Sequence, residues 1–145
     1  MKEMGVKTIV NLRAESEVDK QLLPEGVHYE YFSIRDESAP TEEQGRKFLE
    51  IVGNPDNWPV LVHCHGGEGR AGVMSALVRH SFDGWDHKTI MNEVGNFRVA
   101  HLGLIKTRMN GNQTRFIEEW ETKHPGQWAL ADGKVAASET PVTGN

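Results

Sequence analysis

The feature that most limits how this chain can fold is the junction around its single cysteine, Cys64. A short apolar run, Val60-Leu61-Val62, precedes it, and five residues rich in glycine separate it from Arg70. Beyond Arg70, apolar residues recur at helical spacing, namely Val73, Met74, Leu77, Val78 and Phe82. The pattern predicts a buried strand over residues 60–62, a loop, and a helix over residues 70–82.

The composition of this loop suits the binding of a phosphate dianion. Glycine residues let backbone N–H groups turn inward and approach an anion closely. The helix that follows adds the positive end of its dipole, and the planar guanidinium of Arg70 can bind two phosphate oxygens at once. We therefore expect a phosphate-binding loop that consists of His65, Gly66, Gly67, Glu68 and Gly69, together with Arg70.

The same electrostatic field acts on the sulfur of Cys64. Helix N-termini and nearby cations favour a thiolate, so we expect Cys64 to attack phosphorus in line and to form a phosphocysteine. Other interpretations are a buried structural cysteine, or a metal ligand beside His63 and His65. Neighbours in an extended segment point to opposite sides, and the sequence has no CxxC or HxxxH pair. We expect neither a metal nor a cofactor.

At this point the motif His63-Cys64-x5-Arg70 resembles the signature of the protein tyrosine phosphatase superfamily, and the short chain resembles its dual-specificity branch over residues 5–125. The resemblance implies an enzyme that hydrolyses phosphomonoesters, with phosphotyrosyl protein as the default substrate. Inositol phosphates or phosphoinositides are the alternative substrates. A sulfurtransferase also uses a cysteine loop before a helix, but the spacing from Cys64 to Arg70 fits the phosphatase better.

One position departs from the family pattern. The residue directly after the arginine is usually Ser or Thr, and here it is Ala71. Since that hydroxyl is thought to stabilise the thiolate as it leaves the phosphoenzyme, its absence implies slow breakdown of the intermediate. A phosphate-binding module with little turnover, a pseudophosphatase, is therefore a further hypothesis.

Two loop positions bear on the choice of substrate. Phosphoinositide-directed relatives often have lysine where this chain has His65 and Glu68. A carboxylate at the rim repels a polyanion, which disfavours highly phosphorylated inositols. Lys106, Arg108 and Arg115 could supply compensating positive charge, or could equally be solvated surface residues.

Asp36 is the candidate general acid for the leaving oxygen. It follows a predicted strand over residues 27–34 and precedes a helix start, at which Thr41 and Gln44 form a capping box. In the resembled family the acid is an aspartate on a loop upstream of the cysteine. Asp36 could instead only cap a turn, Glu37 is the competing acid, and Asp56 lies in what reads as a surface turn.

Gln113 is a further candidate. The segment 110–116 resembles the one that supplies a water-positioning glutamine in several branches of the family. Gln113 could equally be a polar first-turn residue of a helix capped by Asn112.

The predicted elements give one α/β domain of three layers, with a parallel-rich central sheet flanked by helices. Strands are expected over residues 8–12, 27–34 and 60–62, and helices over residues 41–52, 70–82, 86 onward, 100–109 and 112–124. We expect residues 1–125 to form the phosphatase domain and residues 126–145 a mobile tail. The segment 5–13 resembles an early but not first strand of the family, which leaves open a missing N-terminal targeting segment.

Net charge and cysteine usage limit the partners. A formal net charge of −5 does not suggest a nucleic-acid or acidic-membrane surface, and one cysteine excludes an internal disulfide. No apolar run reaches transmembrane length. A reactive thiolate survives best in a reducing compartment, so we expect a cytoplasmic protein whose partner is a phosphorylated protein or a phosphorylated small molecule.

Overall fold

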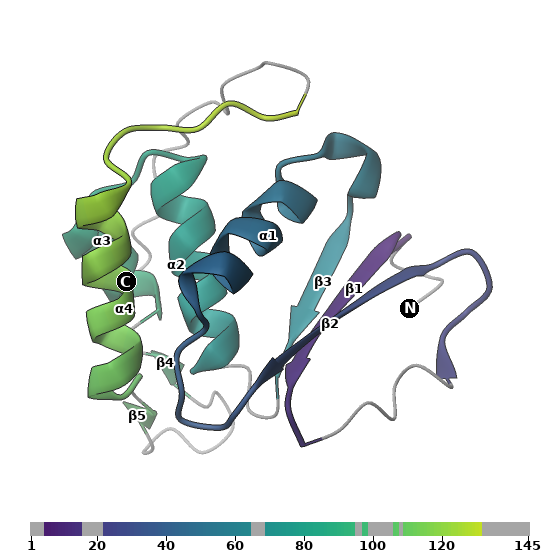
Figure 1. Cartoon of the computed structure of the whole chain (residues 1–145), viewed down its shortest axis with the longest axis horizontal. Helices are drawn as coiled ribbons and strands as arrows, with labels where there is room; N and C mark the ends of the chain where they lie inside the picture. Colours follow the sequence, from purple (N-terminus) through teal and green to yellow (C-terminus); the bar gives the residue numbers. More distant parts are fainter. Residues whose placement is uncertain are drawn as a thin grey trace.

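The computed structural model describes residues 5–15, 22–64, 69–94, 97–98, 106–107 and 109–131. Along the chain its elements are β1 (Thr8–Arg13), β2 (His28–Ile34), α1 (Glu42–Val52), the 3-10 turn η3 (Pro55–Asn57), β3 (Val60–His63), α2 (Arg70–Ser81), α3 (His87–Val94), β4 (Phe97–Arg98), β5 (Lys106–Thr107) and α4 (Gly111–Lys123). Strands and helices alternate over most of this order, which confirms the predicted α/β class (Figure 1).

The main sheet contains three parallel strands in the order β2-β1-β3. Thr8 of the central strand pairs with His28 on one side and with Val60 on the other. Because the strands are parallel and share this register, their carboxyl ends meet at one edge of the sheet. The central strand is buried from Thr8 to Leu12, and Val10 and Leu12 are fully inaccessible.

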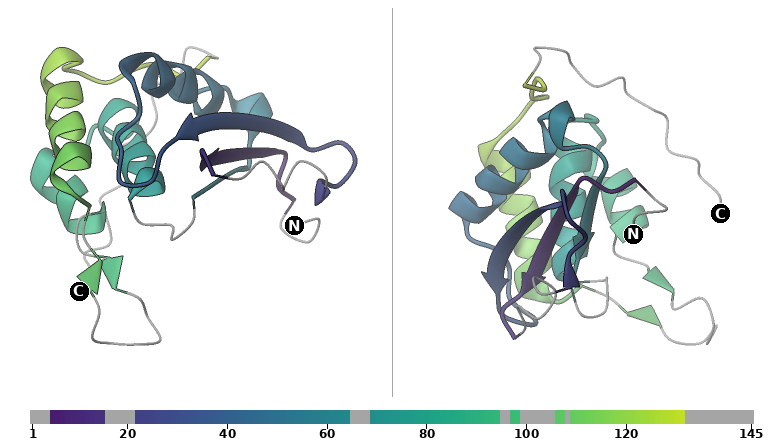
Figure 2. Two further views of the ribbon diagram at one scale, coloured as in Figure 1. Left: turned by 60° about the horizontal axis from the view of Figure 1, so that its bottom comes forward. Right: turned by 90° about the vertical axis from the view of Figure 1, so that its right-hand side faces the viewer.

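The helices gather on one side of this sheet, as two views show (Figures 1 and 2). One core cluster joins Val10 and Leu12 of β1 to Phe48 and Leu49 of α1, Met74 and Leu77 of α2, and Trp120 of α4. Helix α2 is the centre of the helical layer, since it contacts α1, α3 and α4. Among the described residues, no helix is both long and apolar enough to cross a bilayer.

Side-chain caps fix where the helices begin. The Thr41–Gln44 capping box predicted for α1 is confirmed in both directions. The cap of α4 differs from the prediction, because Asn110 and not Asn112 is the N-cap. Asn110 Oδ1 accepts from Gln113 N at 3.0 Å and Gln113 Oε1 accepts from Asn110 N at 3.2 Å. This capping box starts the helix two residues earlier.

The helix predicted over residues 100–109 is wrong where the structure describes it. Lys106 and Thr107 form strand β5, which pairs antiparallel with β4. A β-branched residue and an available partner strand favour the extended backbone here over local helix propensity. Residues 100–105 and 108 lie outside the described residues.

The segment after α4 is tied to the domain up to Ala131. Trp128 N donates to Ser81 O at 2.6 Å, and Ala131 N donates to Gly53 O at 2.8 Å. The Trp128 ring meets the Phe82 ring edge-on, with 6.5 Å between centroids. Residues 126–131 thus belong to the packed domain rather than to the expected tail, and residues 132–145 lie outside the described residues.

Candidate active site

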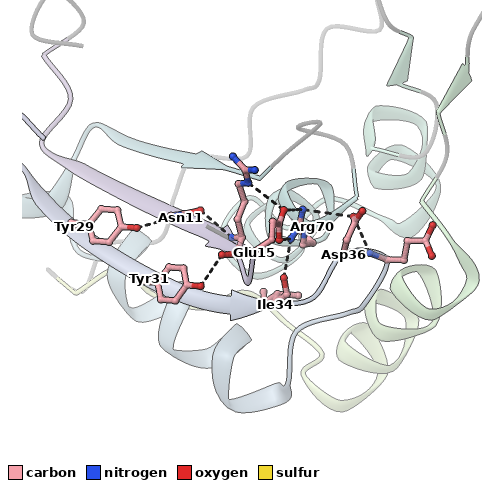
Figure 3. Close-up of polar contacts among 9 residues, drawn as sticks. Asn11, Glu15, Tyr29, Tyr31, Ile34, Asp36 and Arg70 are labelled. Atoms are coloured by element: carbon pink, nitrogen blue, oxygen red, sulfur yellow. Dashed lines mark hydrogen bonds and ion pairs between the residues drawn. The ribbon is translucent and has the colours of Figure 1, made fainter. Parts of the chain in front are cut away.

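The candidate site lies at the carboxyl edge of the sheet, where each strand is followed by a polar or ionisable side chain. Glu15 follows β1, Asp36 follows β2 and Cys64 follows β3, while Arg70 is the first residue of α2. The parallel register brings these four segments together although they are far apart in sequence. Figure 3 shows Glu15, Ile34 and Asp36 grouped around Arg70.

The guanidinium of Arg70 is the centre of this group. Arg70 is only 2% exposed, and a buried charge requires hydrogen-bonded partners. Its Nη1 donates to Glu15 Oε2 at 2.8 Å and to Ile34 O at 2.9 Å, and its Nη2 donates to Glu15 Oε1 at 2.9 Å. The hydrogen bond to Glu15 is the main reason that the pKa of Arg70 is raised above its ordinary value.

Glu15 is the functional residue that sequence reasoning missed. Hydrogen bonding from Arg70 lowers the pKa of Glu15 from 4.5 to about 2, so its carboxylate is ionised at any ordinary pH. The two parallel N–H···O bonds form the bidentate pair that guanidinium and carboxylate prefer. Its place, directly after the central strand at the same edge as Asp36, was the signal that could have pointed to it.

The end of β1 is braced so that Glu15 faces Arg70. Asn11 is fully buried, its Nδ2 donates to Tyr29 Oη at 2.9 Å, and its Oδ1 accepts from Arg13 N at 3.0 Å. Tyr31 Oη donates to Arg13 O at 2.8 Å. Together, the Asn11 side chain of β1 and the two tyrosine hydroxyl groups of β2 hold the backbone just before Glu15 (Figure 3).

Cys64 is half-buried directly after β3, and it packs against the main core cluster, as Ala71 does. The charge of Cys64 is one of the smaller contributions that raise the pKa of Arg70, which places the sulfur within electrostatic reach of the guanidinium. Residues 65–68 of the predicted loop, His65, Gly66, Gly67 and Glu68, lie outside the described residues. Its last residue, Gly69, is described and precedes α2.

Asp36 lies where the sequence placed it, in the loop between β2 and α1. Its Oδ1 is 3.6 Å from Arg70 Nη2, and its side chain is 78% exposed. The same oxygen accepts from Glu37 N at 3.0 Å. Glu37 has a φ of 65°, which is uncommon for a residue with a side chain. Asp56 is not brought to the site, because its turn precedes β3 at the opposite edge of the sheet.

Gln113 lies beside Gly69, the last residue of the predicted phosphate-binding loop. It is 3% exposed, and a Cβ atom added at Gly69 would lie 2.8 Å from Gln113 Nε2. That nitrogen donates to Ser38 O at 3.3 Å, and Asn110 Nδ2 donates to Glu37 O at 2.5 Å. The start of α4 therefore holds two consecutive carbonyl groups of the loop that carries Asp36.

The other charged candidates lie elsewhere. Arg115 is exposed on α4, while Arg108 and the side chain of Lys106 lie outside the described residues. Over the described part of the chain, no cluster of three or more His, Cys, Asp or Glu side chains could bind a metal ion. The site also borders a cavity of about 610 Å³ lined by Arg13, Ala14, Glu15, Arg35 and Asp36.

Comparison with known proteins assigns a family to this arrangement. Residues 1–113 match the family described as "PTP-SAK: Swiss Army Knife protein, DSP-PTPase phosphatase domain". The chain is 30% identical over 127 residues to the tyrosine-protein phosphatase-like protein OCA2 of Saccharomyces cerevisiae. This match covers 83% of this chain and 60% of OCA2. It is 39% identical over 51 residues to the inositol diphosphatase SIW14 of the same yeast, covering 35% of this chain and 18% of SIW14.

The fold has solved counterparts. The core catalytic domain of the PP-IP phosphatase SIW14 from S. cerevisiae, in complex with citrate, superposes with a TM-score of 0.64 at 24% identity. That match covers 88% of this chain and 82% of the SIW14 chain, and at this identity it shows the fold. The chain spans less than two thirds of the length of the curated relatives OCA2 and SIW14.

Proposed function

Because the chain belongs to the dual-specificity-like branch of the cysteine-based protein tyrosine phosphatase superfamily, we propose that it hydrolyses phosphomonoesters through a phosphocysteine intermediate. Cys64 is the nucleophile, Arg70 binds the phosphate, and Asp36 is the general acid. The backbone amides of residues 65–69 complete the phosphate site. A reactive Cys64 thiolate survives best under reducing conditions, which supports a cytoplasmic location as part of this proposal.

The observation that supports this proposal most directly is which N–H groups of the Arg70 guanidinium are already hydrogen-bonded. Both N–H groups of Nη1 and one of Nη2 are used by Glu15 and Ile34 O. The Nε–H and the second Nη2–H have no hydrogen-bond acceptor among the described residues. Glu15 therefore fixes one edge of the planar fork, and the other edge is left to bind two phosphate oxygens.

The reaction follows from these positions. The Cys64 thiolate attacks phosphorus, the phosphorus–oxygen ester bond breaks, and the leaving oxygen takes the proton of Asp36. Arg70 and the loop amides stabilise the charge on the equatorial oxygens. In the second step Asp36, now a carboxylate, accepts a proton from water as the water attacks phosphorus. The phosphorus–sulfur bond breaks, and the thiolate and inorganic phosphate are released.

Gln113 is the predicted water-positioning residue for the second step. Its place beside Gly69 supports that role, since the attacking water must enter next to the loop. To bind the water, Nε2 would exchange its bond to Ser38 O for one to the water.

Two substrate classes fit the proposed chemistry. Phosphotyrosyl protein is the default substrate of the family resemblance. A phosphorylated inositol is the second candidate, favoured by the similarity to a relative named inositol diphosphatase and by two arginines in the cavity next to the site. Phosphotyrosyl peptide and inositol phosphates, assayed side by side for phosphate release, would separate the two classes.

Slow turnover is the second candidate function, and Ala71 is the observation that favours it. Rapid mixing with p-nitrophenyl phosphate tests both functions at once. Sustained release of p-nitrophenol, lost in Cys64→Ser, supports the hydrolase. A burst of about one equivalent followed by near-arrest supports the pseudophosphatase. Turnover that persists in Cys64→Ser would contradict the assigned nucleophile.

A further inference from the structure

The cavity between the ends of β1 and β2 borders the reaction site directly. Two of its lining residues, Glu15 and Asp36, contact Arg70, at 2.8 Å and 3.6 Å. Its volume of about 610 Å³ lies within the range of small-ligand pockets. A second substituent on the ring that carries the scissile phosphate would extend into this space.

The charges that line the cavity are unequally paired. The carboxylate of Glu15 binds Arg70 and lies 3.2 Å from Arg13 Nε, so its charge is already compensated. Asp36 lies 3.6 Å from Arg70 Nη2, so its carboxylate is also paired with that guanidinium. Arg35 is exposed and has no ion-pair partner among the described residues. Arg35 is thus the cation in this cavity that is available to a ligand.

We propose that this cavity is a second phosphate-binding subsite, in which Arg35, assisted by Arg13, binds another phosphate group of the same small ligand. The inference rests on the proposed function, because it takes the first phosphate to lie between Cys64 and Arg70. The ligand is a polyol that carries two phosphate groups a few bonds apart.

Distance and shape support a small ligand. Arg35 and Asp36 are consecutive, so their Cα atoms are about 3.8 Å apart, and Asp36 itself reaches Arg70. An exposed guanidinium at this distance can bind a phosphate through two parallel N–H···O bonds. Among the described residues, the ends of two neighbouring strands line the cavity, and this short lining favours a small ligand over an extended peptide.

Affinity measured without turnover tests the subsite. In the Cys64→Ser chain, isothermal titration would compare inositol 1-phosphate with inositol 1,4-bisphosphate. We expect the bisphosphate to bind about tenfold more tightly, as one charge-assisted hydrogen-bond pair allows. Arg35→Gln should remove this tenfold advantage and leave the affinity for the monophosphate within about twofold.

Arg46→Gln is the matched control, because Arg46 is an exposed arginine of α1 that pairs with Glu42 at 3.7 Å, away from the cavity. It should change neither affinity. The subsite would be overturned if Arg35→Gln lowered the affinity for both ligands equally, or for neither. It would also be overturned if Arg46→Gln lowered the affinity for the bisphosphate as much as Arg35→Gln does. A dependence on Arg35 seen only with a phosphotyrosyl peptide flanked by glutamates would overturn it as well.

Two further arms separate the remaining questions. Vesicles that contain phosphatidylinositol 4-phosphate present a phosphomonoester at position 4 and a phosphodiester at position 1 of the same ring. Arg35-dependent binding to either the vesicle or the free bisphosphate supports the subsite. Hydrolysis of p-nitrophenyl phosphate by the unmodified chain tests the reaction alone. If affinity for the bisphosphate depends on Arg35 but the chain does not hydrolyse p-nitrophenyl phosphate, the proposed hydrolase is contradicted and the subsite stands. If the chain hydrolyses p-nitrophenyl phosphate but affinity does not depend on Arg35, only the subsite is overturned.

Discussion

At the scale of single residues, the pairing of Glu15 with Arg70 decides whether the phosphate site is ready for a ligand. A long arginine side chain has many rotamers, and the two hydrogen bonds that Arg70 donates to Glu15 restrict it. Removal of the carboxylate would leave a buried guanidinium with Ile34 O as its remaining acceptor among the described residues. We therefore expect Glu15 to act as a positioning residue for the proposed reaction.

Glu15→Gln should lower kcat/KM for p-nitrophenyl phosphate by about tenfold or more. The amide keeps the size of the side chain but loses the charge and one of the two acceptors. Glu25→Gln, an exposed carboxylate in the turn before β2, serves as the control and should be neutral. Equal activity of the two variants would show that Arg70 needs no help from Glu15.

The same pair predicts a pH dependence of stability. The pKa of Glu15 is about 2 in the folded chain and 4.5 ordinarily. Its contribution to the free energy of unfolding is fully present above about pH 4.5 and is lost as pH falls toward 2. Thermal midpoints of the unmodified chain and of Glu15→Gln should therefore converge between pH 4.5 and pH 2. A constant difference across that range would contradict the assignment.

Asp36 can be tested through the leaving group. Asp36→Asn should slow the hydrolysis of an alkyl phosphate by about a hundredfold or more, because the alkoxide leaving group needs a proton. p-Nitrophenyl phosphate, with a stable phenolate, should lose much less. Glu37→Gln is the control for the competing acid and should leave the ratio of the two rates unchanged. If Glu37→Gln changed the ratio and Asp36→Asn did not, the acid would be Glu37.

At the scale of elements, the start of α4 positions the loop that carries the acid. Asn110 has two separable functions, because Oδ1 caps the helix and Nδ2 donates to Glu37 O. The bond to Glu37 O also supports a residue at a positive φ, a backbone conformation that few side chains adopt.

Asn110→Asp separates these functions. Aspartate caps a helix as well as asparagine does, so α4 should remain stable, but it has no N–H to donate. We expect kcat for an alkyl phosphate to fall about threefold to tenfold, with a smaller effect on p-nitrophenyl phosphate, as loss of acid positioning requires. Asn112→Asp makes the same change at an exposed position of the first turn. An identical effect of both variants would indicate helix electrostatics instead.

Elements with strong local signals could be predicted from the sequence. The strand before Cys64, the helix after Arg70 and the Thr41–Gln44 cap each depend on residues within one or two turns of chain. The partners of Arg70 could not be predicted in this way, because Glu15 is far from Arg70 in sequence and meets it only through the parallel register of the sheet. The cap at Asn110 was missed because Asn112 offers the same side chain two residues later.

At the scale of the whole molecule, the chain after α4 closes the side of the domain formed by α1, α2 and α4. Trp128 packs between Phe82 and Trp120, and the backbone bonds of Trp128 and Ala131 join the segment to the ends of α2 and α1. The apolar pattern decays from Gly126 onward, which suggested a tail, since nothing local shows that an aromatic side chain will return to the core.

Trp128→Ala should destabilise the domain by about 2 kcal/mol, less than a fully buried tryptophan would, because the ring is only half-buried. Urea unfolding followed by circular dichroism measures this change. Trp58→Ala is the control, since Trp58 is 41% exposed and should cost less. Equal losses, or none for Trp128, would indicate that the domain ends at residue 125.

The carboxylate that binds Arg70 also has an effect at long range. Because Glu15 cancels one unit of positive charge at the mouth of the site, and the protein as a whole carries −5, little attraction reaches an anion in solution. Encounter with a monophosphate should then proceed at the rate of unassisted diffusion and docking, and respond only weakly to added salt. Such a site selects anions after they arrive, by contacts at close range.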